Sequence, residues 1–155
     1  MKIGIAFDHA GFPAKEVIKQ TVEAEGHEVV DFGTDSTTSV DYPDYAEKLG
    51  KALESKQIDR GILVCGSGVG ACIAANKMNG VYAGICHDTY SARQGVEHDN
   101  MNVLCLGARI IGPELIKEIV RAFLNARFSA EERHIRRTQK IYRLEKLMNV
   151  KKGES

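Results

Sequence analysis

Short apolar runs alternate with longer segments of helical periodicity along this chain, and this alternation constrains the fold more than any other feature. Apolar runs of four to six residues, expected as strands, occupy 3–7, 28–32, 61–65, 81–86 and 103–106. Helical segments are expected from Pro13 to a stop at Gly26, over 42–56, 71–78 and 89–97, from Gly112 onward, and over 129–150. Strands that are apolar on both faces, each followed by a helix, indicate βαβ units. The sequence therefore predicts an α/β fold: a Rossmann-like, doubly wound sheet of five parallel strands in a three-layer sandwich, with an extra C-terminal helix.

Length and charge indicate a single domain and argue against several classes of protein. The 155 residues suit a single domain over 1–150, followed by a frayed tail at 151–155. Twenty-one basic residues balance 21 acidic ones, which argues against a nucleic-acid binder. No apolar stretch approaches the roughly 18 residues of a membrane span, and Asp8 and His9 interrupt the N-terminal apolar run too early for a signal peptide. We therefore expect a cytoplasmic protein that binds neither nucleic acid nor membrane.

The four cysteines do not form a recognisable framework. No two have the C-x-x-C spacing of zinc knuckles and thioredoxin-like sites, and four in a chain of this length do not indicate a disulfide scaffold. Cys86 and Cys105 lie within apolar runs and are expected in the core.

Polar and ionisable residues follow nearly every expected strand. Asp8 and His9 follow the first, Cys65 to Gly70 the third, His87 and Asp88 the fourth, and Arg109 the fifth, while the helix before the fifth ends at 98–100. Parallel α/β sheets bind ligands at the carboxyl ends of their strands. We expect the functional site there.

The segment Cys65-Gly66-Ser67-Gly68-Val69-Gly70 is the most informative of these. Three glycines allow backbone N–H groups to approach a ligand closely, and the following helix N-terminus favours negative charge. A thiolate at Cys65 would be stabilised there, so Cys65 is a candidate base or nucleophile. The alternatives are a tight turn that merely requires glycine and a further core cysteine.

A dinucleotide site is a weaker interpretation of the same segment. Gly66-x-Gly68-x-x-Ala71, with Asp88 further on, fits the fingerprint, but it follows the third strand instead of the first. Cys65 and Ser67 would also place reactive groups where pyrophosphate should pack. The chain has no G-x-x-x-x-G-K-[ST] motif, which excludes a P-loop.

The C-terminal helix carries a basic cluster and unexplained apolar residues. Arg133 and Arg137 are four residues apart, so both guanidinium groups project from one helix face and could grip a phosphate. The alternative is a solvated basic face paired with Glu131 and Glu132. The apolar residues of this helix either fold back on the same domain or pack on a second subunit; they are Ile135, Ile141, Tyr142, Leu144, Leu147 and Met148.

Together these residues resemble the type B ribose-5-phosphate isomerases and the related galactose-6-phosphate isomerase subunits. The matching segments are IAFDHAGF (5–12), VDYPDYA (40–46), GILVCGSGVG (61–70), IAANK (73–77), His98 with 102–103, 107–109, and Arg133-His134 with Arg137. The resemblance implies an aldose–ketose isomerase for D-ribose 5-phosphate and D-ribulose 5-phosphate, with six-carbon substrates such as allose 6-phosphate as a further option. It also implies no metal or cofactor, and a homodimer or homotetramer whose active site is shared between subunits through the C-terminal helix.

The resemblance assigns roles by position. Cys65 is the base that moves a proton between C2 and C1, Ser67 assists hydroxyl proton movement, and the backbone of Gly66, Ser67, Gly68, Val69 and Gly70 stabilises the enediolate. His98 opens the furanose ring with help from Asp8. The expected phosphate ligands are His9, Arg109, Arg133 and Arg137.

Two departures from the family pattern affect substrate preference. Asp99, which the resemblance places among the substrate-binding residues, stands where the family commonly has an asparagine. Because an ionised carboxylate only accepts hydrogen bonds, either Asp99 contacts a sugar hydroxyl or the substrate preference is altered. Glu131 and Glu132 replace a frequent glycine pair. A non-catalytic nucleotide- or sugar-phosphate-binding module with the same loop is the alternative function.

Overall fold

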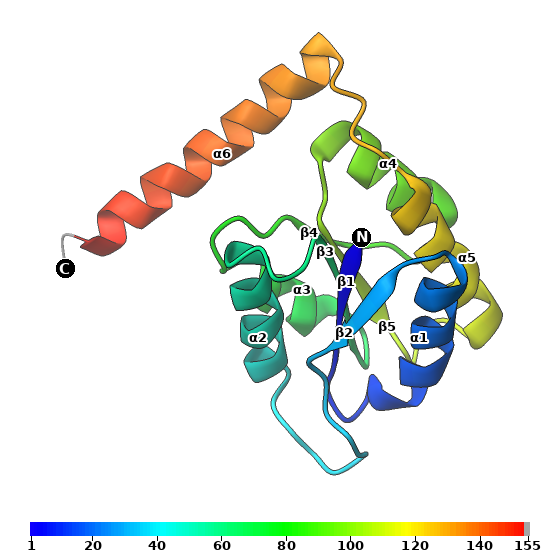
Figure 1. Cartoon of the computed structure of the whole chain (residues 1–155). Helices are drawn as coiled ribbons and strands as arrows, with labels where there is room; N and C mark the ends of the chain where they lie inside the picture. Colours follow the sequence, from blue (N-terminus) through cyan, green and yellow to red (C-terminus); the bar gives the residue numbers. More distant parts are fainter. Residues whose placement is uncertain (154–155) are drawn as a thin grey trace.

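Five parallel strands form one sheet at the centre of the computed structural model, which describes residues 1–153, with side chains described to Val150 (Figure 1). The strands are β1 (Lys2–Phe7), β2 (Glu28–Asp31), β3 (Arg60–Cys65), β4 (Ala83–Ile85) and β5 (Val103–Gly107). Their order is β2-β1-β3-β5-β4, and every neighbouring pair is parallel. The predicted α/β fold is confirmed. The run 28–32 is less apolar than the other four, which favours an edge position, and β2 does lie at a sheet edge.

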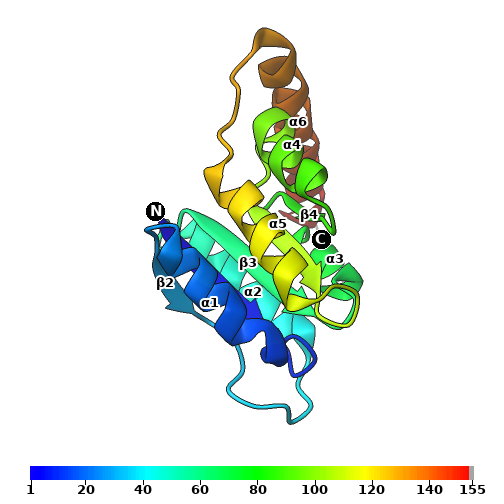
Figure 2. The same cartoon turned by 90° about the vertical axis from the view of Figure 1, so that its right-hand side faces the viewer.

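Helices cover both faces of the sheet. The helices α1 (Lys15–Ala24), α4 (Thr89–Asp99) and α5 (Pro113–Asn125) pack on one face, and α2 (Tyr42–Glu54) and α3 (Val69–Ala75) on the other (Figures 1 and 2). A short 3-10 helix, η1 (Phe12–Ala14), precedes α1. This arrangement gives the three layers that the alternating pattern predicts.

The two faces of each strand supply two separate cores. Ile62 and Val64 of β3 pack with α1 and α5, whereas Leu63 and Cys65 pack with α2 and α3. Successive side chains of a strand point to opposite faces, so the last residue of β3 is directed toward the α3 side. Cys86 and Cys105 are buried, as the sequence predicts.

Several element boundaries differ from the prediction. The predicted helix 71–78 is α3 over Val69–Ala75, because Gly68 adopts a left-handed conformation (φ 82°) immediately before it. The helical spacing of six apolar residues predicts a buried stripe for α5, and all are buried except Leu115, which is 38% exposed; the six are Leu115, Ile116, Ile119, Val120, Phe123 and Leu124. Leu115 lies outside the i, i+3, i+4, i+7, i+8 pattern that begins at Ile116.

The C-terminal helix α6 (Glu132–Gly153) lies outside the three layers (Figures 1 and 2). His134 and Thr138 are buried near its N-terminal end, where α6 packs on α4. It begins three residues later than predicted and extends into the expected tail at 151–155, of which 154–155 lie outside the described residues. No helix in the described part of the chain has the length and apolarity needed to span a membrane.

Candidate active site

A cavity of about 420 Å³ lies at the carboxyl ends of β1, β3 and β5, the edge of the sheet where the sequence predicts a site. The chain passes to one side of the sheet after β1 and to the other after β3, so this is the topological switch point of the fold. Ten residues line the cavity: Asp8, His9, Ala10, Tyr42, Cys65, Gly66, Ser67, Gly70, Arg109 and Ile110.

The glycine-rich loop wraps around the sulfur of Cys65. The backbone N–H of Gly68 donates a hydrogen bond to Cys65 Sγ over 3.1 Å, and Cys65 is 5% exposed. A Cβ at Gly68 would lie 3.0 Å from the carbonyl carbon of Leu106, and its φ of 82° is disfavoured for other residues. Glycine is thus required here to bring the amide to the sulfur.

Asp8 is fixed at the cavity wall by the loop that follows β1. Its Oδ1 accepts hydrogen bonds from the N–H groups of Ala10 (2.9 Å) and Gly11 (2.8 Å). The residue is 5% exposed, and within the described chain its Oδ2 has no hydrogen-bond partner. The carboxylate is therefore held rigidly with one oxygen left for a ligand.

Basic side chains stand beside this thiol and carboxylate. Nδ1 of His9 lies 3.1 Å from the backbone N and 3.2 Å from the backbone O of Val40, which leaves Nε2 for the cavity. The side chain of Arg109 runs along Gly66, where a Cβ would approach its Nη1 to 3.4 Å. An exposed guanidinium beside an imidazole suits a phosphate group.

Tyr42 is a cavity residue that the sequence reasoning missed. It begins α2, is 39% exposed, and its ring lies over Gly70, where a Cβ would be 2.6 Å from Cζ. The sequence feature that could have revealed Tyr42 is its place in VDYPDYA, one of the segments that carry the resemblance. Without coordinates, that segment could be placed on a helix but not over the loop.

Four of the predicted site residues lie away from this cavity. His98 and Asp99 end α4, and Arg133 and Arg137 lie near the start of α6. None of the four lines the Cys65 cavity within the described chain. Arg133 instead pairs with Glu131 over 3.0 Å, as the alternative interpretation of the basic cluster allows, and both groups are more than half exposed.

The polar residues that follow β4 in the sequence make hydrogen bonds that support the fold. Asp88 accepts a hydrogen bond from the N–H of Ser91 over 2.7 Å and so caps α4. Nε2 of His87 accepts the N–H of Gly107 over 2.9 Å, and burial lowers the pKa of His87. Asp88 is therefore occupied as a helix cap, which weakens the dinucleotide interpretation.

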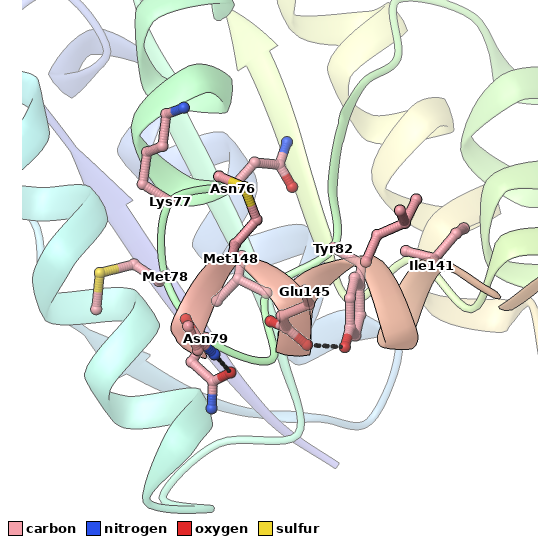
Figure 3. Close-up of a pocket in the computed structure, with 11 residues that line it drawn as sticks. Asn76, Lys77, Met78, Asn79, Tyr82, Ile141, Glu145 and Met148 are labelled. Atoms are coloured by element: carbon pink, nitrogen blue, oxygen red, sulfur yellow. Dashed lines mark hydrogen bonds between the residues drawn. The ribbon is translucent and has the colours of Figure 1, made fainter. Parts of the chain in front are cut away.

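A second cavity of about 260 Å³ lies between α6 and the segment 76–82 (Figure 3). Glu145 accepts hydrogen bonds there from the N–H of Gly80 (2.6 Å) and from the hydroxyl of Tyr82 (2.7 Å). These contacts fasten α6 to the segment 76–82 of the same chain. None of the predicted site residues lines this cavity, so the Cys65 cavity is the candidate active site.

Known proteins share this architecture and sequence. The family model described as Ribose/Galactose Isomerase matches residues 3–141. The D-erythrulose-4-phosphate isomerase of Pectobacterium atrosepticum is 45% identical over 129 residues, which cover 83% of this chain and 85% of the relative. The ribose-5-phosphate isomerase B of Clostridium thermocellum superposes with a TM-score of 0.92 at 44% identity, covering 96% of this chain and 99% of that one. The Mycoplasma genitalium ribose-5-phosphate isomerase B, solved with bound ribulose-5-phosphate, gives a TM-score of 0.86 at 41% identity over 94% and 96% of the two chains.

Proposed function

Because this chain belongs to the ribose/galactose isomerase family, we propose that it interconverts D-ribose 5-phosphate and D-ribulose 5-phosphate through an enediolate. The observation that carries the proposal is the sulfur of Cys65, which faces a ligand-sized cavity and accepts the N–H of Gly68. Two relatives with this fold are named ribose-5-phosphate isomerases, and one of them holds ribulose-5-phosphate.

Cys65 acts as the base in this proposal. Its thiolate takes the proton from C2 of the open-chain aldose, the electron pair forms the C1–C2 double bond, and the same proton returns to C1. Backbone N–H groups of the loop 66–70 face the oxygen on which negative charge develops. Removing one donor of this kind typically costs about 10²–10³ in rate. Ser67, exposed at the cavity rim, moves the proton between the two substrate oxygens.

The phosphate lies at the basic end of the cavity. His9 and Arg109 are both cavity-lining residues and supply one side of the phosphate site. Binding energy from this remote group positions a small, flexible sugar for proton abstraction. Arg133 and Arg137 complete the site from a second subunit.

The second subunit follows from the distribution of the predicted residues. Asp8 lies in the Cys65 cavity, whereas His98, its predicted partner in ring opening, does not. A two-fold assembly that brings α4 and α6 of one subunit over the cavity of the other would join them. Large apolar side chains remain exposed near the cavity and on α6: Val69, Ile73, Ile110, Ile141, Leu144, Leu147 and Met148. An interface of this composition supports a homodimer, alone or as half of a tetramer.

Mixing two inactive variants tests the shared site. Cys65→Ser and His98→Asn should each be inactive alone. After unfolding and joint refolding, half of the dimers carry one intact Cys65 beside one intact His98, so about a quarter of wild-type activity should return. A mixture that stays inactive, although both variants refold and associate, would contradict a shared site.

The variant Cys65→Ala distinguishes an isomerase from a protein that only binds the sugar phosphate. This variant should lose turnover while ribose 5-phosphate still raises its melting temperature, because the phosphate site is intact. Unchanged turnover would remove Cys65 as the base, and lack of turnover in the wild-type protein would favour a binding module. Activity should also persist in excess chelator, since we propose no metal or cofactor.

Substrate preference is tested with a panel of sugar phosphates. One relative is named for D-erythrulose 4-phosphate, and the sequence leaves allose 6-phosphate as an option. Asp99→Asn restores the amide common in the family, so a change in the ratio of kcat/KM for five- and six-carbon substrates would place Asp99 against the sugar. We expect the reaction to take place in the cytoplasm, which cell fractionation would check.

A further inference from the structure

The imidazole of His98 is held on two sides. The side-chain Nε2 of Gln94, one helical turn earlier, lies 3.0 Å from His98 Nδ1. The ring of His134 stacks on that of His98, with centroids 4.0 Å apart and an interplanar angle of 24°. Among the described residues, these contacts leave Nε2 of His98 for a ligand.

His134 is itself anchored within its own subunit. It is 1% exposed, and its Nδ1 lies 2.6 Å from Ser129 Oγ. The N–H of Ser129 donates to the carbonyl oxygen of Glu97 over 2.9 Å, which joins the start of α6 to the end of α4. The stacked ring is therefore a fixed surface, not a mobile side chain.

The contact with Gln94 selects one form of the neutral His98 ring. An amide N–H₂ group only donates, so Nδ1 of His98 must offer its lone pair. The single proton of the neutral imidazole then resides on Nε2, the nitrogen that is not engaged.

We propose that Gln94 and His134 are positioning residues that hold neutral His98 as its Nε2–H tautomer, with that N–H directed toward the sugar bound by the partner subunit. The inference rests on the proposed function, in which His98 serves ring opening. It adds the two side chains that set the tautomer and the plane of the ring.

Charged groups surround this pair from both helices. Arg133 and Arg137 act on His134 from α6 and Glu131 from the residue just before it, while Glu97 and Asp99 flank His98 on α4. Burial is the largest cause that lowers the pKa of His134, and the positive charges of Arg133 and Arg137 act in the same direction. A lowered pKa favours the neutral imidazole of His134, which stacks on His98 without charge repulsion.

Substitutions at Gln94 separate tautomer control from a merely structural hydrogen bond. A carboxylate only accepts hydrogen bonds, so Gln94→Glu favours the form of neutral His98 with its proton on Nδ1. Nε2 then carries no proton and cannot donate a hydrogen bond to the sugar. Gln94→Leu removes the contact, but an isolated neutral imidazole already favours the Nε2–H form. On ribose 5-phosphate at pH 8.5 we expect kcat to fall about 10- to 100-fold in Gln94→Glu and about threefold or less in Gln94→Leu. A merely structural bond would give the opposite order, because Glu is the closer replacement.

The tautomer can be read without any turnover. In ¹⁵N-histidine spectra of the intact protein at pH 8.5, with His98 assigned from the signal lost in His98→Asn, the wild type should show a protonated Nε2 and Gln94→Glu a protonated Nδ1. A wild-type ring protonated on Nδ1 would overturn the proposal even if His98 is catalytic. If His98→Asn retains turnover, the ring-opening role fails, while the spectra still decide the tautomer.

His134 is tested by keeping or removing its ring. His134→Phe preserves an aromatic surface and should keep kcat within about threefold, whereas His134→Ala should lower kcat about tenfold with little change in KM. Equal effects of the two variants, with both proteins folded as judged by circular dichroism, would contradict a role in orienting His98.

Discussion

The protonation of His87 bears on the packing of the glycine-rich loop 66–70. Its Nε2 accepts the N–H of Gly107, and a Cβ on Gly107 would touch the Ser67 carbonyl at 2.6 Å. When Nε2 is protonated, it has no lone pair and can no longer accept the hydrogen bond from the N–H of Gly107. The histidine is thus a structural neighbour of the site, although it follows a strand in the same way as the cavity residues.

Stability should fall at mildly acidic pH because of His87. Burial lowers its pKa below the ordinary histidine value of about 6.5, so the unfolded chain binds this proton more readily than the folded one. The stabilisation is complete above about pH 6.5 and is lost as the pH falls through the folded-state pKa. The pKa values of His27 and His134 are lowered as well and act in the same direction. Urea unfolding between pH 7.5 and 5 should show the loss, and a smaller one in His87→Gln; an equal slope in that variant would remove His87 as a contributor.

Cys72 should be the fast-reacting thiol among the three cysteines outside the site. A hydrogen bond from Cys105 is the main cause that lowers the pKa of Cys72 to about 7, whereas burial raises the pKa of Cys86 to about 11. The pKa of Cys105 is also raised, first by its contact with Cys72. With iodoacetamide at pH 7.5, mass spectrometry should find Cys72 labelled before Cys86 and Cys105, since the thiolate is the nucleophile. Labelling of Cys86 at the same rate as Cys72 would contradict this order.

The shape of the glycine-rich loop 66–70 depends on the backbone conformation of Gly68. Gly68→Ala combines an unfavourable φ of 82° with a close approach to Leu106, and it should displace the N–H that Cys65 Sγ accepts. We expect about 1–3 kcal/mol lower stability and at least about 10²-fold lower kcat.

Gly26→Ala is the matched control for Gly68→Ala. Gly26 has nearly the same φ, 80°, but a Cβ there meets no atom within 4 Å, and it lies at the end of α1 instead of in the loop. Its stability should fall by about 1 kcal/mol with kcat unchanged. Denaturation curves and coupled assays on both variants check the pair, and an active Gly68→Ala would show that the loop amide is dispensable.

Elements were predicted well where the local pattern alone decides them. The five apolar runs became the five strands, because burial on both faces leaves a continuous apolar signature. The start of α3 was misplaced by two residues, since the left-handed turn at Gly68 can only be located once the loop packs against β5. Tyr42 was missed for a related reason: its contact with Gly70 joins residues that are distant in the sequence.

At the scale of the whole molecule, the predicted site residues lie in two separate groups. Cys65, Asp8 and Arg109 share one cavity, while His98 and Arg137 belong to α4 and α6 outside it. Sequence order alone carries no information about which residues meet across subunits. The exposed apolar side chains supply that information, because they mark the surface that a partner would cover.

Ile73→Glu tests whether the two groups must meet. Ile73 is 59% exposed on α3, four residues from the equally unpartnered Val69, and it does not line the Cys65 cavity. A carboxylate there should leave the monomer fold intact but place a charge in the proposed interface, which is costly without a partner. We expect light scattering to detect monomers and kcat to fall at least about 10²-fold.

Lys19→Glu is the control, since it places a carboxylate, by reversing an exposed charge, on α1, which packs on the opposite face of the sheet. This variant should keep the wild-type assembly and turnover. If instead Ile73→Glu is a fully active monomer, one chain holds a complete site, and His98, Arg133 and Arg137 must be removed from the mechanism together.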